Sequence, residues 1–310
     1  MEGHLVPDTG LANAVNYFRH MSRTVRIAQI DAFTERPFAG NPAAVVLEAS
    51  GLTDEQMHAI AREMNLSETA YLLPAEVPEA DYRLRWMTPA TEVNFCGHAT
   101  VATVHAMHEA GLLKGGRVIF QARIGLITAT LEEGWVWLQP PLPKLEPVGA
   151  DVGPLLEAFG LGAGDLAGWA PPMLGGERDV LLPCRGLDAL RRAQPDVHRL
   201  TAIGRQCGWR AFCLTTLETF DPGSSLHSRF FAPQSGVLED PVTGSVHASL
   251  AVYVTGAGKA PDRFTAEQGH FLGRPGHLRV EVERQADGAV CKVRVGGRAV
   301  TVLHGELILP

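Results

Sequence analysis

Two segments of this chain, 144 positions apart, carry the same pattern of residue types. Residues 85–89 read RWMTP and residues 229–233 read RFFAP, and each segment continues into a polar signature and then an apolar stretch. Aligned without a gap, Cys96 falls opposite Asp240. Because the offset is close to half of the 310 residues, the repeat predicts two related halves, with a catalytic site between them.

The composition excludes several classes of protein. The net charge of -7 argues against a nucleic-acid partner, which usually requires a basic face. No run of eighteen apolar residues is present, so we expect no membrane span. The five cysteines form no Cys-x-x-Cys pair, which favours reduced thiols in the cytoplasm over disulfides or a zinc knuckle.

The order of predicted elements indicates an α+β fold. Strands outnumber helices, and no Gly-x-Gly-x-x-Gly motif follows a strand, which argues against a dinucleotide-binding fold. We expect two pseudo-symmetric lobes, each a curled, mostly antiparallel sheet around one central helix. A segment with four prolines, 140–147, separates them. The predicted boundaries are 24–140 with the C-terminal strand 298–310, then 141–297, preceded by a flexible extension, 1–23.

The clearest local signal precedes a helix in the first half. Thr53 and Gln56 form a capping-box pattern, which predicts a helix over 54–64 that ends at Asn65. A strand is predicted next, over 66–73, and it carries Glu68. A carboxylate in an apolar strand is costly unless it is paired, or acts as an acid or base with a raised pKa. A solvated strand face is the alternative.

Each repeated signature stands directly before a predicted helix. Segments 96–100 and 240–245 would therefore present free amides and the positive end of a helix dipole, which together suit a carboxylate. Gly97 and Gly244 would let the backbone approach a ligand closely. Ordinary helix caps remain an alternative, and Asp240 in an Asp-Pro pair also fits a simple turn.

The sequence suggests two further chemistries, each with an observation against it. Cys96 at a helix start could be a base or nucleophile, but a two-base racemase needs a second cysteine where Asp240 stands. His98, His105 and His108 invite a metal, but their spacing fits zinc patterns poorly, so no metal site is predicted.

Several motifs together resemble those of the phenazine-biosynthesis PhzF-like family. They cover roughly residues 25–309 and lie at 31–34, 38–45, 65–70, 96–100, 240–245, 267–269 and 273–276. The resemblance implies a diaminopimelate-epimerase-like fold with barrel-like lobes. It also implies a cofactor-independent isomerase, usually a homodimer.

The resemblance also assigns roles to individual residues. The best-known member isomerises trans-2,3-dihydro-3-hydroxyanthranilate with a glutamate as acid and base, and Glu68 matches that glutamate. Cys96 stands where related epimerases keep one catalytic cysteine. The catalytic residues are predicted to be Glu68, His98 and Asp240, and the substrate-binding residues Cys96, Gly97, Gly244 and Ser245.

The expected reaction is acid/base proton transfer on a small carboxylate-bearing metabolite in the cleft between the lobes. Two alternatives remain open at this point. One is a cysteine-dependent amino-acid epimerase, racemase or dehydratase. The other is a non-catalytic protein that binds a small molecule.

Overall fold

A computed structural model describes residues 23–309 of the chain. It is a mixed α/β structure in which strands predominate, and hydrogen bonding connects all eighteen strands. The coarse α+β prediction is confirmed. The extension expected for residues 1–23 lies outside the described residues, apart from Arg23. Within the described part, no helix is long and apolar enough to cross a membrane.

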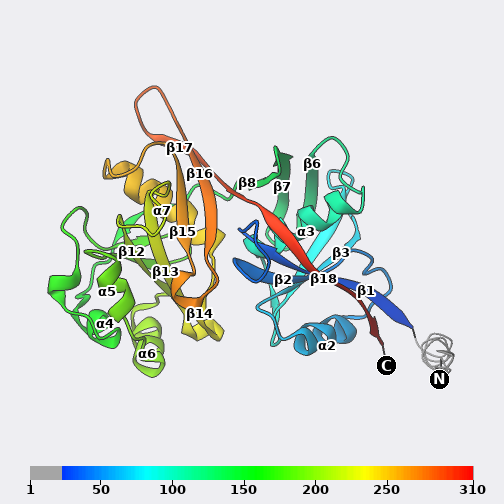
Figure 1. Cartoon of the computed structure of the whole chain (residues 1–310), viewed down its shortest axis with the longest axis horizontal. Coiled ribbons are helices and arrows are strands. Elements are labelled where there is room, and N and C mark those ends of the chain that lie inside the picture. Colours follow the sequence, from blue (N-terminus) through cyan, green and yellow to red (C-terminus); the bar gives the residue numbers. More distant parts are fainter. Residues whose placement is uncertain (1–22, 310) are drawn as a thin grey trace, which may run out of the picture.

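The elements fall into two groups, which lie side by side in Figure 1. The N-terminal group comprises β1 (Thr24–Ala32), β2 (Asn41–Val46), α2 (Asp54–Met64), β3 (Thr69–Pro74), β4 (Tyr82–Met87), β5 (Glu92–Val93), α3 (Gly97–Glu109), β6 (Arg117–Ala122), β7 (Gly125–Glu132), β8 (Trp135–Leu138) and the last strand of the chain, β18 (Ala299–Ile308).

The C-terminal group contains the remaining elements. They are β9 (Glu146–Pro147), α4 (Gly153–Ala158), η1 (Ala163–Asp165), β10 (Met173–Gly175), β11 (Asp179–Pro183), α5 (Leu187–Arg192), α6 (Val197–Cys207), β12 (Ala211–Thr216), β13 (Leu226–Ala232), η2 (Pro233–Ser235), β14 (Val237–Asp240), α7 (Gly244–Gly256), β15 (Arg263–Gln268), η3 (His270–Leu272), β16 (Gly276–Arg284) and β17 (Val290–Gly297).

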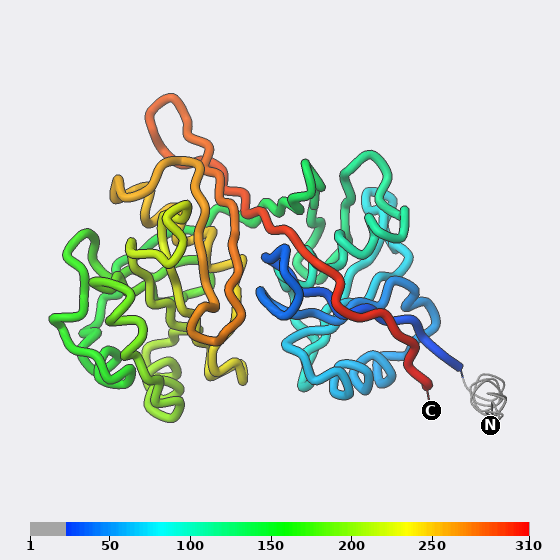
Figure 2. Tube along the Cα trace, viewed as in Figure 1, coloured from blue at the N-terminus to red at the C-terminus, as the bar shows by residue number. Residues whose placement is uncertain are grey.

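One strand pairing connects the groups, that of β8 with β17. After β17 the chain itself crosses back, and β18 pairs antiparallel with β1 within the N-terminal group, where Thr24 faces Ile308. Figure 2 shows this return as the red tube that crosses from one group to the other and ends beside the first described strand.

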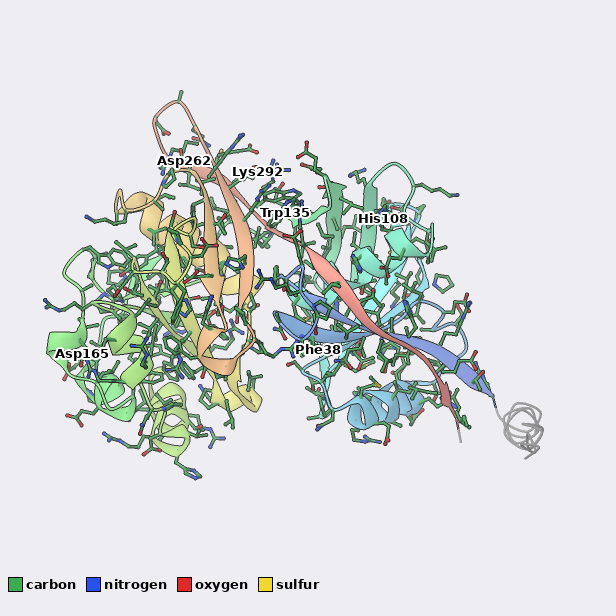
Figure 3. The ribbon with its side chains drawn as sticks, viewed as in Figure 1. Phe38, His108, Trp135, Asp165, Asp262 and Lys292 are labelled. Atoms are coloured by element: carbon green, nitrogen blue, oxygen red, sulfur yellow. The ribbon has the colours of Figure 1, made fainter. Side chains whose placement is uncertain are left out.

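Side-chain contacts also join the groups around the loop between β1 and β2. Arg274 of the C-terminal group pairs with Asp31 at 2.7 Å, and its guanidinium donates to the carbonyl oxygens of Ala39 and Gly40. Phe38, in the same loop, is labelled in Figure 3 on the side of the N-terminal group that faces the other group.

Each group contains one deeply buried helix. In α3 and α7, buried residues occur on every face, as expected for a helix that strands surround. α3 contacts β1, β2, β3, β8 and β18, whereas α7 contacts β10, β16 and β17. By contrast, α2 buries only one face, and it has the predicted capping box at Thr53 and a left-handed Asn65 at its end.

The repeat is visible in the strands but changes its offset before the helices. β4 and β13 lie 144 positions apart, whereas α3 begins at Gly97 and α7 at Gly244, 147 positions apart. The gap-free pairing of Cys96 with Asp240 is therefore wrong at the level of structure. The N-cap residue equivalent to Cys96 is Thr243, and three extra residues precede it in the second copy.

Candidate active site

Glu68 lies at the end of a turn and not within a strand. The left-handed Asn65 ends α2, and β3 begins only at Thr69, so the prediction that a strand carries Glu68 is wrong by one position. The backbone carbonyl of Glu68 accepts a hydrogen bond from the amide of Ala44, which anchors this turn to β2. The side chain is only 16% exposed.

The start of α3 supplies the groups nearest to Glu68. His98 Nε2 lies 3.3 Å from Glu68 Oε2, and Cys96 Sγ lies 3.4 Å from His98 Nδ1. Burial lowers the pKa of His98 to about 3, so its imidazole is neutral at physiological pH. Burial, together with the charge of Glu68, raises the pKa of the Cys96 thiol well above its usual range. Cys96 is therefore a protonated thiol.

Asp240 comes from the C-terminal group and is held by three polar neighbours. The Thr243 hydroxyl donates to its Oδ2 at 2.5 Å, and the Asn41 amide donates to its Oδ1 at 2.8 Å. Gln268 donates to the backbone carbonyl of Asp240 and accepts from the amide of Thr243. Burial raises the pKa of Asp240 to about 6, although the bonds from Thr243 and Asn41 oppose that rise.

The charge of Asp240, in the C-terminal group, acts on Glu68 in the N-terminal group. The pKa of Glu68 is raised to about 7, mainly by burial and next by the negative charge of Asp240. A hydrogen bond with Cys96 acts in the opposite direction and lowers this pKa. Oε2 of Glu68 is buried and has no hydrogen-bond partner among residues 23–309. Glu68 is therefore partly protonated at neutral pH, which suits a group that both gives and takes a proton.

The first turns of α3 and α7 are not capped by side chains. The N-cap residues, Cys96 and Thr243, make no capping hydrogen bond, and neither first turn contains an acidic residue. Thr243 instead directs its hydroxyl hydrogen to Asp240. Free amides at two helix starts favour an anion.

The two glycines at these helix starts differ in their surroundings. A Cβ on Gly244 would stand 3.1 Å from Phe33, so packing restricts that position. The nearest atom to a Cβ on Gly97 would be 3.9 Å away. Ser245 follows Gly244 as His98 follows Gly97, and it is half-buried.

Glu68, Cys96 and His98 could also form a metal-binding cluster, since one donor atom of each lies within 4.8 Å of the others. A thiol must lose its proton to ligate a metal, and the pKa of Cys96 is raised. The chemistry of this donor set therefore favours proton transfer.

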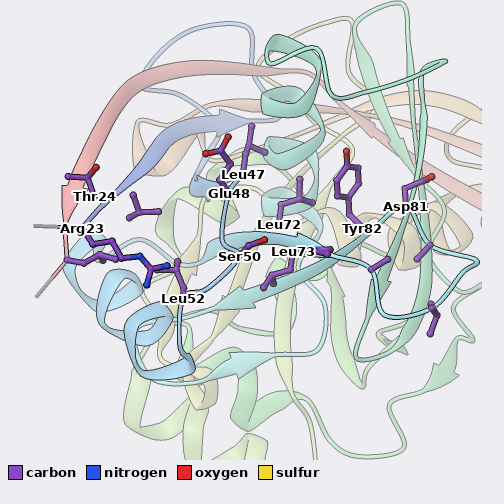
Figure 4. A pocket seen from close by; sticks show the side chains of 16 residues that line it. Arg23, Thr24, Leu47, Glu48, Ser50, Leu52, Leu72, Leu73, Asp81 and Tyr82 are labelled. Carbon is purple, nitrogen blue, oxygen red and sulfur yellow. The ribbon is translucent and has the colours of Figure 1, made fainter.

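The roles of Asn41, Thr243 and Gln268 were missed from the sequence. Each is polar and lies within or beside a motif, but only the folded chain brings their side chains to Asp240. A cavity of about 810 Å³ lies elsewhere, along β1 to β4 (Figure 4). Arg23, Leu72 and Tyr82 are among its lining residues, and Glu68 is not.

Comparison with known proteins identifies relatives along nearly the whole chain. Residues 30–305 match the family model PhzC-PhzF, described as phenazine biosynthesis-like protein. The uncharacterized isomerase YfhB of Bacillus subtilis is 33% identical over 287 residues, which cover 90% of this chain and 97% of that protein. An uncharacterized isomerase of Pseudomonas aeruginosa is 37% identical over 282 residues, with coverages of 91% and 97%.

Solved structures agree with these matches. The crystal structure of the Bacillus anthracis phenazine biosynthesis protein of the PhzF family is 30% identical, with a TM-score of 0.85. The match covers 93% of this chain and all of that one. A hydroxyproline epimerase from Agrobacterium vitis, 12% identical with a TM-score of 0.60, is similar in fold alone over 93% of this chain and 94% of that one.

Proposed function

This chain belongs to the PhzC-PhzF family of phenazine biosynthesis-like proteins and is an isomerase, and we propose that it moves a proton within a small carboxylate-bearing substrate. In this proposal, the substrate binds between two pseudo-symmetric lobes, and trans-2,3-dihydro-3-hydroxyanthranilate represents the class. The reaction uses no cofactor, and the enzyme is a cytoplasmic homodimer.

The buried carboxyl group of Glu68 is the observation that carries the proposal. A pKa of about 7 gives comparable amounts of acid and base near neutral pH, so the group can take a proton from one carbon atom and return it to another. Its Oε2 makes no hydrogen bond within residues 23–309, although His98 Nε2 lies 3.3 Å away, and burial keeps competing water away from it.

The uncapped starts of α3 and α7 support a further part of the proposal, the stabilisation of negative charge on the reacting substrate. Removal of a proton next to a carboxylate leaves an enolate, whose negative charge must be stabilised. The amides near Gly97 and Gly244, with the hydroxyl of Ser245, would bind the substrate carboxylate.

Asp240 and His98 are assigned to orienting and relaying roles. The charge of Asp240 raises the pKa of Glu68, and His98 Nε2 lies 3.3 Å from Glu68 Oε2. A neutral imidazole can donate from one nitrogen and accept at the other, which suits a hydroxyl or amino group of the substrate.

Deuterium uptake tests this proposal directly. Purified protein in heavy water is incubated with a panel of cyclic and amino carboxylates, and the gain in substrate mass is measured. We expect uptake that disappears in Glu68→Gln, which keeps size and hydrogen-bonding capacity but cannot exchange a proton as an acid. Glu63→Gln, an exposed change on α2, is the matched control and should leave uptake intact. Undiminished uptake in Glu68→Gln would overturn the assignment.

A further inference from the structure

One edge of the last strand is not covered by another strand of the described chain. Among residues 23–309, β18 pairs with β1 alone. Its second half, residues 303–308, is exposed apart from the half-buried Leu307. Figure 1 shows this end of β18 on the side of the N-terminal group that faces away from the C-terminal group. An exposed strand edge is a place where a further strand can pair.

The pairing with β1 determines which backbone groups point into the open edge. The Leu309 amide donates to the carbonyl of Arg23, so the backbone groups of Leu309 point toward β1. In an antiparallel pair, every second residue directs its amide and carbonyl to the same side. His304, Glu306 and Ile308 therefore direct theirs away from β1, into the open edge.

The open edge is apolar for an exposed strand. Leu303 is 47% exposed and Ile308 is 59% exposed. Strand edges that stay single are usually protected by lysine or proline, and residues 303–308 contain neither. Exposed apolar side chains beside unpaired backbone groups therefore favour association with another strand.

Gly305 stands in the middle of this edge, although its own chain does not require glycine there. A Cβ built on it would meet only Cδ2 of Leu303, at 3.6 Å, which is an ordinary contact. Glycine weakens the interior of a strand, and it often marks a point where another backbone approaches closely. This position therefore suits the approach of a second strand.

The sequence of the edge is complementary to itself. If two copies of β18 pair antiparallel with Gly305 opposite Gly305, His304 of each copy lies opposite Glu306 of the other, and Leu303 lies opposite Leu307. Both members of the polar pair direct their backbone groups into the edge, so this register gives reciprocal hydrogen bonds. An imidazole can donate to a carboxylate, whereas a register centred on Glu306 would place two like charges opposite each other.

We propose that the homodimer forms by antiparallel pairing of β18 with β18 of a second copy, across a twofold axis at Gly305. This inference rests on the homodimer of the proposed function and adds its surface. A twofold pairing uses the same edge on both copies, so it closes after two chains. It uses none of the residues assigned to proton transfer.

Disulfide formation at the axis tests the register. Cα atoms in a non-hydrogen-bonded antiparallel pair lie about 4.5 Å apart, within the range that a disulfide spans. Gly305→Cys, combined with Cys291→Ser to remove the exposed native thiol, should link most chains into covalent dimers under mild oxidation. Leu303→Cys in the same background should link at least about tenfold less, because its two copies would lie about 14 Å apart. No linkage through Gly305→Cys, or stronger linkage through Glu306→Cys, would overturn the proposal.

Sedimentation of the full chain provides the second arm. His304→Glu places like charges opposite each other and should weaken the dimer about tenfold. His304→Pro removes an amide hydrogen that points away from β1 and should weaken it about a hundredfold. Leu303→Ser should also weaken it, and Leu126→Ser, at a 53% exposed leucine on β7, is the matched control. Far-ultraviolet circular dichroism checks the fold of each variant.

The outcomes separate this proposal from the isomerase assignment. A dimer that the edge variants leave unchanged, or that Leu126→Ser disrupts equally, would overturn the proposed surface while the homodimer stands. A monomeric unmodified chain would overturn both the surface and the homodimer. Deuterium uptake is measured on the same samples, and its absence from a dimer that the edge variants do weaken would count against the isomerase proposal alone.

Discussion

The side-chain amide of Asn41 donates a hydrogen bond of 2.8 Å to Oδ1 of Asp240, which lies 199 positions further along the chain. The same nitrogen donates to the carbonyl of Val242 at 2.9 Å. Asn41 begins β2 and is fully buried, so this one amide ties the N-terminal group to the segment that leads into α7. The position of Asp240 relative to Glu68 therefore depends on a contact between the two groups.

Replacement of Asn41 should change both stability and the protonation of Asp240. Asn41→Ala leaves Asp240 with one donor fewer, which costs about 1–3 kcal/mol for a buried acceptor. Because the lost bond stabilised the charged form, the pKa of Asp240 should rise further. Urea unfolding measures the first effect and the pH dependence of turnover the second. Asn94→Ala, at an exposed position, is the control, and equal effects of the two changes would contradict the role of Asn41.

The raised pKa of Glu68 makes the stability of the protein depend on pH. The folded value is about 7 and the ordinary value 4.5, so between these limits the unfolded chain has lost a proton that the folded chain keeps. Stability therefore falls as pH rises through this window, by at most about 1.4 kcal/mol per pH unit for one group. Below pH 4.5 Glu68 is protonated in both the folded and the unfolded protein, so its contribution to the free energy of unfolding is fully present.

Unfolding of the unmodified protein and of Glu68→Gln at several pH values isolates this effect. The unfolding free energy of the unmodified protein minus that of Glu68→Gln should decrease from pH 5 to about pH 7.5 and then become constant. Asp240 changes in the same direction, with its pKa raised to about 6, but it is present in both proteins and largely cancels. A difference that does not vary with pH would show that the pKa of Glu68 is not raised.

Local signals in the sequence predicted local structure well. The bounds of α2 match the predicted range 54–64, because a capping box is complete within a few positions. The prediction missed α6 and β15. β15 pairs in parallel with β13 and antiparallel with β16, and such distant partners leave little trace in a single sequence.

The candidate site was predicted only in part, because it depends on contacts between segments that are distant in the sequence. Motif resemblance identified Glu68 and Asp240, yet only the structure shows that Asp240 raises the pKa of Glu68. The change of offset from 144 to 147 could not be read from the sequence either. Three extra residues before α7 leave the repeated residue types recognisable, but they place Thr243 at the N-cap and Asp240 opposite Phe230 of β13.

Cys96 should contribute little to the chemistry. Its thiol is buried and its pKa is raised well above the usual range, so the nucleophilic thiolate is scarce. We expect Cys96→Ala to retain turnover within about tenfold, and the protein to react slowly with iodoacetamide at this position compared with the exposed Cys291. Peptide mass mapping of the alkylated protein measures both rates. Complete loss of turnover in Cys96→Ala would instead support thiol-based epimerisation.

The two equivalent arginines of the repeat should differ in their importance for stability. Arg85 pairs with Glu92, and Arg229 pairs with Glu239, each through two hydrogen bonds. Arg123 also reaches Glu92, at 2.6 Å, so loss of Arg85 leaves that carboxylate with a partner.

Glu239 has no second cationic partner within residues 23–309, and Arg229 additionally donates to two backbone carbonyls, those of Leu190 and Ala193. Arg229→Ala should therefore cost about 3–5 kcal/mol, the usual result when a buried carboxylate loses its partner. Arg85→Ala should cost less, and Arg191→Ala, a surface ion pair, less than about 1 kcal/mol. Urea unfolding at pH 7 ranks the three variants. If Arg85→Ala proved as costly as Arg229→Ala, the shared contact of Glu92 with Arg123 would not explain the difference between the two copies.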